Sequence, residues 1–139
     1  MAIVANIHAI VWYLVEPERL SQVALDAPDG SITAGEPVYI SAISLIEICY
    51  LIEICYLIEK RRIGTDLLQR ILAVLNAPNP NLVVVLIDLA ISIAVWDINR
   101  DTVPDMPDRI IAATALHLNL PLVTRDRKIL SEGANVMIW

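Results

Sequence analysis

Two aspartates frame the most informative segment of the chain, Asp108 to Asp126, which reads DRIIAATALHLNLPLVTRD. Apolar residues recur after Asp108 with the 3.6-residue period of a helix, so this acid is predicted at a helix start. Pro121 stops that helix, because proline has no backbone donor and restricts the residue before it. Residues 122–124 are then predicted as a short buried strand, and Asp126 falls just past its carboxyl end.

These two acids are expected to meet in space. In a parallel α/β sheet the carboxyl ends of strands and the starts of helices gather on one edge, where ligands bind. A third acid, Glu47, is expected in the first turn of the helix that follows a predicted strand at residues 38–41. Hard oxygen ligands with open positions suit Mg²⁺ or Mn²⁺. Acids around such ions can activate a water molecule and stabilise the charge that develops on a phosphodiester.

Asp105 lies in the loop before Asp108 and is a candidate accessory acid. Acids are common at helix starts because they complement the helix dipole, and for Asp105 alone that ordinary explanation is favoured. For Glu47, Asp108 and Asp126 together, all expected on one edge of the sheet, the metal-binding interpretation is favoured instead.

Short apolar strands alternate with helical patterns, which indicates one domain over residues 1–139 with a parallel sheet and right-handed crossovers. The hydrophobic content of 57% suits a sheet covered on both faces. Residues 28–30 are expected to break a helix that begins at Pro17, and Gly64 to end a long helix that begins at Ser44. Strands are expected at 2–5, 38–41, 82–87, 122–124 and 135–139, and the other helices at about 8–15, 66–75, 89–98 and from 108.

The net charge of −6 argues against a general affinity for nucleic acids, which usually shows as a basic surface. Acids gathered around divalent ions account for part of this charge. Basic residues beside the two aspartates are the candidates for contacting nucleic acid, and they are Arg109, Arg125 and Arg127. Each of them is equally well explained as a solvated surface charge.

The sequence carries no signal for membrane insertion or export. The longest apolar stretch, residues 82–96, is broken by Asp88, and none reaches the roughly 20 residues that a spanning helix needs. The amino terminus lacks the basic, apolar and small-residue regions of a signal peptide. We therefore expect a cytoplasmic protein without membrane contact, in which Cys49 and Cys55 are reduced thiols.

Residues 45–50 and 51–56 are both LIEICY, and residues 57–59 begin a third copy. Six positions turn an α-helix by about 240°, so Glu47, Glu53 and Glu59 point in different directions and at most one can face a given site. The repeat is expected to lengthen the helix by about 9 Å, so that it projects from the body or packs on a second chain. A looped-out copy is the alternative.

The segments SAISLIEI, DRIIAATA and LVTRDRKI, in this order, resemble those of PIN domains, and among them the VapC-type toxins. The resemblance covers nearly the whole chain. It implies a three-layer α/β/α fold with a central, mostly parallel sheet. It also implies an Mg²⁺- or Mn²⁺-dependent endoribonuclease held inactive by a cognate VapB-like antitoxin. The implied catalytic and metal-binding cluster is position 6, Glu47, Asp108 and Asp126, with Thr124 and Asp105 as accessory residues.

The chain departs from this pattern at two places. The family's first aspartate is here Asn6, which keeps an oxygen ligand but loses its charge, so metal affinity or activity is expected to fall by at least about 10–100-fold. His8 is expected to pack rather than replace the acid, because hard cations prefer oxygen. Within the repeat, two residues could correspond to the family's glutamate. Family spacing counted from the preceding strand selects Glu47, whereas spacing counted back from the basic residues 60–62 selects Glu53. Glu47 is preferred, because the strand fixes the start of the helix.

The leading hypothesis is a VapC-like ribonuclease toxin with a compromised site, which takes RNA as substrate, an antitoxin as partner and a homodimer as its expected assembly. The alternative is a catalytically inactive PIN-like module that binds an antitoxin or self-associates through its long apolar helix. A third alternative is that Asn6 or the repeat is an inactivating lesion.

Overall fold

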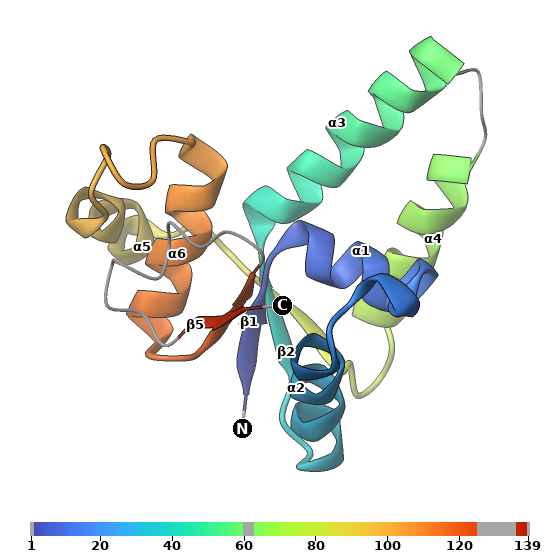
Figure 1. Ribbon diagram of the computed structural model, residues 1–139, viewed down its shortest axis with the longest axis horizontal. Coiled ribbons are helices and arrows are strands. Elements are labelled where there is room, and N and C mark those ends of the chain that lie inside the picture. The colour runs from blue at the N-terminus through green and yellow to red at the C-terminus, as the bar shows by residue number, and fades with distance from the viewer. Residues whose placement is uncertain (1, 60–62, 125–135, 139) are drawn as a thin grey trace.

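A computed structural model describes residues 2–59, 63–124 and 136–138 (Figure 1). All strands are parallel and form a five-stranded sheet in the order β3-β2-β1-β4-β5. The strands are β1 (Ile3–Ala5), β2 (Val38–Ser41), β3 (Leu82–Val85), β4 (Leu122–Thr124) and β5 (Val136–Ile138). The helices are α1 (Ile7–Val15), α2 (Gln22–Thr33), α3 (Ala42–Glu59), α4 (Ile63–Leu75), α5 (Leu89–Ala94) and α6 (Met106–Leu118), with the short 3₁₀ turns η1 (Pro17–Arg19) and η2 (Val95–Asp97).

Helices cover both faces of this sheet, as the alternation of side chains along β1 requires. Ile3 and Ala5 belong to one hydrophobic core, which includes residues of α1, α2, α3 and α4. Val4 belongs to a second core, formed largely by α6. In Figure 1, α1, α2 and α4 lie on one side of the sheet, and α5 and α6 on the other. The predicted three-layer α/β/α fold is therefore confirmed.

β1 lies in the middle of the sheet, between β2 and β4. Val4 pairs with Tyr39 on one side and with Leu122 on the other. The chain thus builds the sheet outward from β1 in both directions, which makes the carboxyl end of β1 a topological switch point. Ligands bind at such points in open parallel sheets, because the flanking connections leave in opposite directions.

The hexamer repeat is helical in this structure. α3 runs without interruption from Ala42 to Glu59 and contains both complete copies, so the looped-out alternative is wrong. Figure 1 shows α3 extending away from the sheet, with α4 packed beside it. The expected long projecting helix is therefore found, and it exposes the apolar side chains of Ile46, Tyr50 and Leu51.

The predicted break at residues 28–30 is wrong, because these residues lie within α2. The helix begins after Ser21, whose hydroxyl accepts a hydrogen bond from the Ala24 backbone N–H at 3.3 Å, rather than at Pro17. Pro28 is buried in the contact of α2 with the body, and burial of its ring offsets the backbone hydrogen bond that proline cannot make. The left-handed turn comes later, at Gly35 with φ of 74°.

Four other boundaries differ from prediction. α3 begins at Ala42, directly after β2, and Ser41 Oγ accepts a hydrogen bond from the Ile43 backbone N–H at 3.3 Å. Gly64 lies inside α4 and does not end the preceding helix. β3 ends at Val85, two residues early, and α5 gives way to a 3₁₀ turn after Ala94.

None of the described helices is long and apolar enough to cross a membrane. Cys49 is a free, exposed thiol on α3. The side chain of Cys55 lies outside the described part of the chain.

Candidate functional site

Asn6 stands at the carboxyl end of β1 and is 7% exposed. Its Oδ1 accepts a hydrogen bond from the Ala9 backbone N–H at 3.0 Å, which caps α1. Its Nδ2 donates to Thr124 Oγ1 at 2.9 Å, at the carboxyl end of β4. Both ends of the amide are therefore bonded, and the side chain is fixed at the centre of this edge of the sheet.

Glu47 lies in the second turn of α3, one turn later than predicted, and is half-buried. Its Oε1 is buried without a hydrogen-bond partner. Burial raises the pKa of Glu47 from 4.5 to about 7, and repulsion from Asp108 and then from Asp105 adds to the shift. The structure therefore brings Glu47 and Asp108 near one another, whereas Glu53 is exposed.

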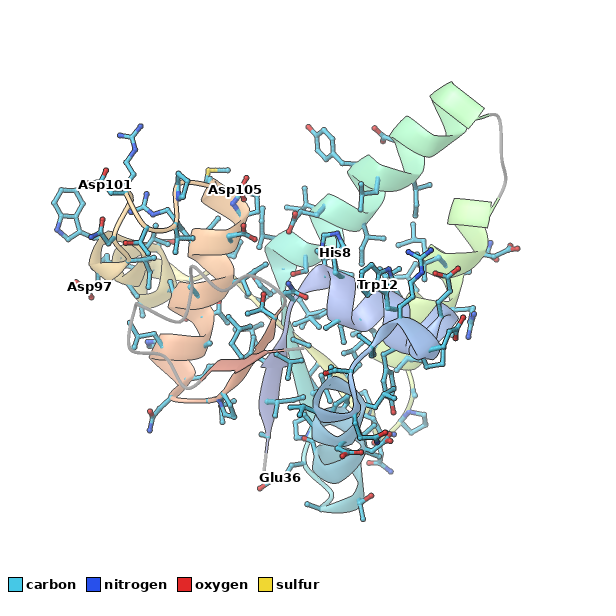
Figure 2. The ribbon with its side chains drawn as sticks, in the orientation of Figure 1. His8, Trp12, Glu36, Asp97, Asp101 and Asp105 are labelled. Atoms are coloured by element: carbon cyan, nitrogen blue, oxygen red, sulfur yellow. The ribbon has the colours of Figure 1, made fainter. Side chains whose placement is uncertain are left out.

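Asp105 and Asp108 are both placed by the start of α6, which begins at Met106 rather than at Asp108. Asp105 is the cap of this helix, because its Oδ1 accepts a hydrogen bond from the Asp108 backbone N–H at 3.1 Å. Capping is an ordinary structural role for an acid at a helix start, and the accessory role of Asp105 in the site stays a prediction. Figure 2 labels Asp105 at the end of α6 that faces the start of α3. Asp108, half-buried in the first turn, is the acid that acts more strongly on Glu47.

Ser44 is a candidate residue of this site that the sequence analysis missed. The helix was expected to begin at Ser44, but Ser44 lies inside the first turn of α3, is 1% exposed, and its Oγ has no hydrogen-bond partner. Ser44 precedes Glu47 by three residues, so the two share one side of the helix. Two buried oxygens without hydrogen-bond partners on one helix face are available to bind a ligand. The spacing of Ser44 and Glu47 is the signal that could have found it.

Three predicted site residues, Arg125, Asp126 and Arg127, lie outside the described residues. Asp126 follows the end of β4 by two positions in the sequence. Among residues 2–59, 63–124 and 136–138, no group of three or more His, Cys, Asp and Glu side chains could hold a metal ion. The described residues thus supply the pair Glu47 and Asp108, and a complete metal site requires further oxygen ligands.

This pair fits a divalent cation on chemical grounds. Asp108 repels the Glu47 carboxylate and contributes to its raised pKa, so a cation placed beside these two acids would offset their negative charge. The buried Glu47 Oε1, without a donor of its own, is an available oxygen ligand. Mg²⁺ and Mn²⁺ prefer such oxygen ligands and use few protein side chains.

Arg109, a candidate for contacting RNA, has other contacts. Its Nη2 donates to the backbone carbonyl of Val95 at 3.1 Å and to that of Ile98 at 2.9 Å. These bonds fasten η2 to α6, and Arg109 Nε is buried without a partner. The structure therefore explains Arg109 by its internal hydrogen bonds, and gives no support to a role in RNA binding.

His8 has a packing contact, as expected. The exposed His8 ring lies edge-to-face with Trp12 at 5.9 Å between centroids (Figure 2). The guanidinium of Arg19 lies over the Trp12 ring at 5.4 Å.

The sequence profile of the PIN domain matches residues 8–134, and the chain belongs to the PIN domain family. The resemblance of its three segments to this family is thereby confirmed. No curated protein matches the sequence.

The fold is similar to those of solved toxin–antitoxin complexes. One is VapBC2 from Rickettsia felis bound to a DNA fragment from its promoter, with a TM-score of 0.70, 14% identity, and 100% of this chain and 98% of that chain covered. A toxin–antitoxin complex from Klebsiella pneumoniae has a TM-score of 0.62 at 19% identity, with coverages of 97% and 95%. FitAcB from Neisseria gonorrhoeae has a TM-score of 0.66 at 20% identity, with coverages of 99% and 96%. At these identities the likeness establishes a shared fold.

Proposed function

We propose that this chain is a metal-dependent endoribonuclease of the VapC type, whose activity is reduced by Asn6. The observation that carries the proposal is the pair Glu47 and Asp108, brought together from α3 and α6. Membership of the PIN family and a fold shared with toxin–antitoxin complexes support it.

The proposed ligands of the cation are Glu47, Asp108, Asp126 and the oxygen of Asn6. Mg²⁺ or Mn²⁺ bound there would stabilise the negative charge that develops on a cleaved phosphodiester. Glu47 must lose its proton to act as a ligand, and its pKa of about 7 allows this near neutral pH. Thr124, hydrogen-bonded to Asn6, is an accessory residue that orients the amide.

Asn6 weakens this site for two reasons. An amide oxygen carries no formal charge, so it offsets less of the cation's charge than the family's aspartate would. In addition, Asn6 Oδ1 already accepts the capping hydrogen bond from Ala9. An aspartate at this position can cap α1 with one oxygen and use the other as a ligand.

The proposed partners are an RNA substrate and a VapB-like antitoxin. The solved structures to which this chain is similar are complexes of a toxin with an antitoxin, which supports the second partner. Basic residues for the RNA are expected at Arg125 and Arg127, while Arg109 is occupied by its bonds to Val95 and Ile98.

RNA cleavage by the full chain tests the activity. With Mn²⁺ supplied, the Asn6→Asp protein should cut single-stranded RNA faster than the unsubstituted chain. Asp108→Asn in the same background should abolish cleavage, whereas Glu53→Gln, a matched change on the exposed copy of the repeat, should leave it intact. If the Asn6→Asp protein cuts no RNA across a broad set of sequences, the enzymatic proposal fails.

A second candidate function is a non-catalytic module that binds an antitoxin or a second copy of itself. The exposed apolar side chains of Ile46, Tyr50 and Leu51 on α3 favour it. It predicts purification with a partner protein and no divalent-ion affinity in either the unsubstituted or the Asn6→Asp chain. Divalent-ion affinity that depends on Asp108 would reject it.

A further inference from the structure

Three side chains form a stacked row along α1. The His8 ring lies edge-to-face with the Trp12 ring, with 5.9 Å between their centroids and 69° between their planes. The Arg19 guanidinium lies over the Trp12 ring at 5.4 Å from its centroid, and Arg19 also forms an ion pair with Glu16. His8 and Trp12 are four residues apart, so they lie on one side of the helix, as Figure 2 shows. We name His8, Trp12 and Arg19 the α1 row.

His8 is the exposed end of the α1 row. Among residues 7–10, all of which the structure describes, only the His8 side chain is exposed, and the other three are buried. Trp12 is half-buried and packs against the hydrophobic core. Contacts with this core and with Arg19 hold the Trp12 ring in place, so His8 packs against a fixed neighbour. The row therefore presents one ordered ring at the surface of the first turn of α1.

This exposed ring lies beside the proposed cation site. Asn6, at the carboxyl end of β1, precedes His8 by only two residues and caps the same helix. Two residues of an α-helix rise by about 3 Å along its axis. Neighbouring nucleotides of one strand are separated by about 3.4 Å along the axis of a nucleic-acid helix. A nucleotide whose phosphate lies at Asn6 can therefore place its own base, or that of its neighbour, at His8.

We propose that His8 is a stacking platform for one unstacked base of single-stranded RNA, next to the phosphodiester that is cleaved. The proposal deepens the proposed ribonuclease function and rests on it. Aromatic side chains, histidine among them, bind the bases of single-stranded RNA by stacking. Every base has a π face, so such a platform adds affinity without reading the sequence. Trp12 and Arg19 are positioning residues, because they fix the His8 ring.

Local charge permits this contact in a chain whose net charge is −6. The first turn of α1 carries no acidic residue, and the backbone N–H groups at a helix start carry partial positive charge. Glu16, the first acid after Asn6 in the sequence, is paired with Arg19. A phosphate that lies over the start of α1 therefore meets no carboxylate from this helix.

The surface around His8 suits a base better than a partner protein. Of the large apolar side chains that are exposed in the described residues, none lies on α1. Protein interfaces have an apolar centre built from many side chains, whereas one base needs only one ring. The α1 row thus has the size of a nucleotide contact.

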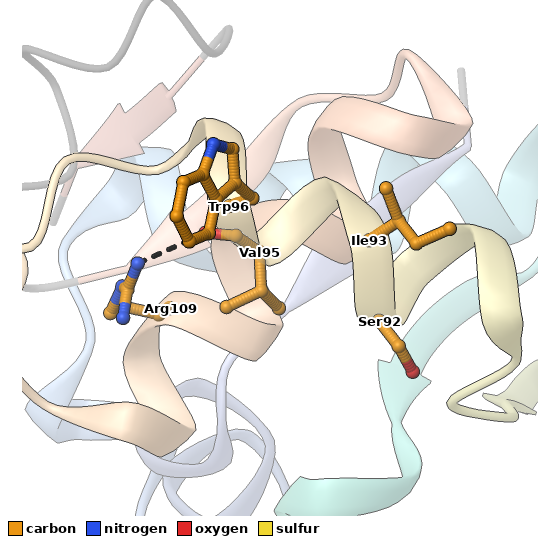
Figure 3. A pocket seen from close by; sticks show the side chains of 5 residues that line it. All are labelled: Ser92, Ile93, Val95, Trp96 and Arg109. Carbon is orange, nitrogen blue, oxygen red and sulfur yellow. Dashed lines mark hydrogen bonds between the residues drawn. The ribbon is translucent and has the colours of Figure 1, made fainter.

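Trp96 provides a matched control, because it is an exposed aromatic ring elsewhere on the molecule. It is 88% exposed in η2, beside a pocket of about 400 Å³ that Arg109 also lines (Figure 3). The hydrogen bond from Arg109 to the Val95 carbonyl, drawn in Figure 3, occupies the neighbouring cation. In Figure 1, α5 and α6, against which η2 packs, lie on the opposite side of the sheet from α1. Removal of the Trp96 ring should therefore leave the α1 row intact.

Binding of a fluorescently labelled single-stranded RNA to the full chain, in EDTA so that no cleavage occurs, tests the platform. His8→Ala should raise the dissociation constant at least about fivefold, because a base–aromatic stack is lost. His8→Tyr keeps an aromatic ring and should stay within about twofold of the native value. Trp96→Ala should leave it unchanged. Equal values for the native chain and His8→Ala, or no binding by the native chain up to on the order of 100 μM, would overturn the proposal.

An abasic scan of the RNA shows whether the lost contact is a stack on one base. RNA that lacks the base at the contacted position should bind the native chain as weakly as intact RNA binds His8→Ala. The two losses should not add when they are combined, because either change removes the same contact. Losses that add at every position of the scan would show that His8 does not stack on a base.

Cleavage by the Asn6→Asp protein with Mn²⁺ separates this proposal from the nuclease activity. A stack that is equally strong in the bound and transition states lowers KM alone, so His8→Ala in this background should raise KM at least about fivefold with kcat unchanged. RNA cleavage with the same KM in both proteins would overturn the platform and leave the nuclease function standing. RNA binding that depends on His8, in a chain that cuts no RNA, would support the platform and reject the nuclease function.

Binding of a VapB-like antitoxin gives the outcome expected for a protein contact. If His8→Ala leaves RNA binding unchanged but weakens antitoxin binding, the α1 row contacts protein and the proposal is wrong. Circular dichroism spectra verify that each variant is folded.

Discussion

The Asn6 amide donates a 2.9 Å hydrogen bond to the Thr124 hydroxyl and so joins the carboxyl ends of β1 and β4. These two strands are neighbours in the sheet, and both side chains are buried. The same amide caps α1 through its oxygen. One side chain thus connects a helix and two strands at the carboxyl edge of the sheet.

Thr124→Val is expected to lower the free energy of unfolding by about 1–3 kcal/mol, because it leaves the buried Asn6 Nδ2 without its acceptor. Urea denaturation measures the change. Thr33→Val, at the exposed end of α2, is the control and should stay within about 0.5 kcal/mol of the native chain. Equal effects of the two substitutions would mean that the Asn6–Thr124 bond does not matter for stability.

Glu47→Gln is expected to stabilise the metal-free protein and to remove its affinity for Mn²⁺. The carboxylate is held near Asp108 with one oxygen unpaired, so a neutral amide relieves the repulsion but loses the charged ligand. Glu53→Gln occupies the same place in the second LIEICY copy and should change neither property, because Glu53 is exposed. Thermal unfolding measures the stability, and calorimetric titration measures the affinity for Mn²⁺. If Glu53→Gln lowers the affinity for Mn²⁺ and Glu47→Gln does not, the ligand is Glu53 and the assignment to Glu47 is wrong.

The stability of the metal-free protein is expected to fall as the pH rises from about 4.5 to about 7. The folded protein keeps a proton on Glu47 in this window, because its pKa is raised from 4.5 to about 7, whereas the unfolded chain has released it. The folded state then binds more protons, so the free energy of unfolding decreases with pH and stays lower above pH 7. Melting temperatures at pH 5 and pH 8 measure this fall.

Two controls belong to this pH prediction. Glu47→Gln should remove the part of the stability decrease that comes from Glu47, because no carboxyl group remains there to titrate. Mn²⁺ competes with the proton on Glu47, so its affinity should rise about tenfold between pH 6 and pH 8 in the native chain. An affinity that is flat over this range would show that Glu47 is not a ligand.

Much of the fold could be predicted from the sequence. The segment DRIIAATALHLNLPLVT forms α6 and β4 as expected, since its helical period is strong and Asn119, with φ of 52°, and Pro121 end the helix. The preference for Glu47 over Glu53 rested on the strand before α3. It agrees with the structure, where α3 starts directly after Ser41 and leaves no loop in which the register could shift.

Other features depend on tertiary packing that local patterns do not encode. Pro28 continues α2 because its ring is buried against the body of the protein. Asp105 caps α6 because the helix begins two residues earlier than its apolar period suggests. Arg109 follows Asp108 in sequence and seemed available to RNA, but its direction on α6 brings it to the carbonyls of Val95 and Ile98.

Arg109→Gln is expected to lower the free energy of unfolding by about 2–4 kcal/mol, because two charged hydrogen bonds to backbone carbonyls are lost. The exposed Arg100→Gln is the matched control and should change it by less than about 0.5 kcal/mol. Urea denaturation compares the two. If Arg109→Gln is instead as stable as the native chain and lowers the salt dependence of RNA binding, Arg109 contacts RNA after all.

We propose that oxygens from Asn6, α3 and α6 meet in one cation site, and that the amide of Asn6 impairs it. Calorimetric titration with Mn²⁺ at pH 8 tests it on the native chain, Asn6→Asp and Asn6→Asp/Asp108→Asn. The native chain should bind Mn²⁺ weakly, Asn6→Asp should bind it at least about tenfold more tightly, and the double variant should not bind it. Equal affinity in all three proteins would contradict it.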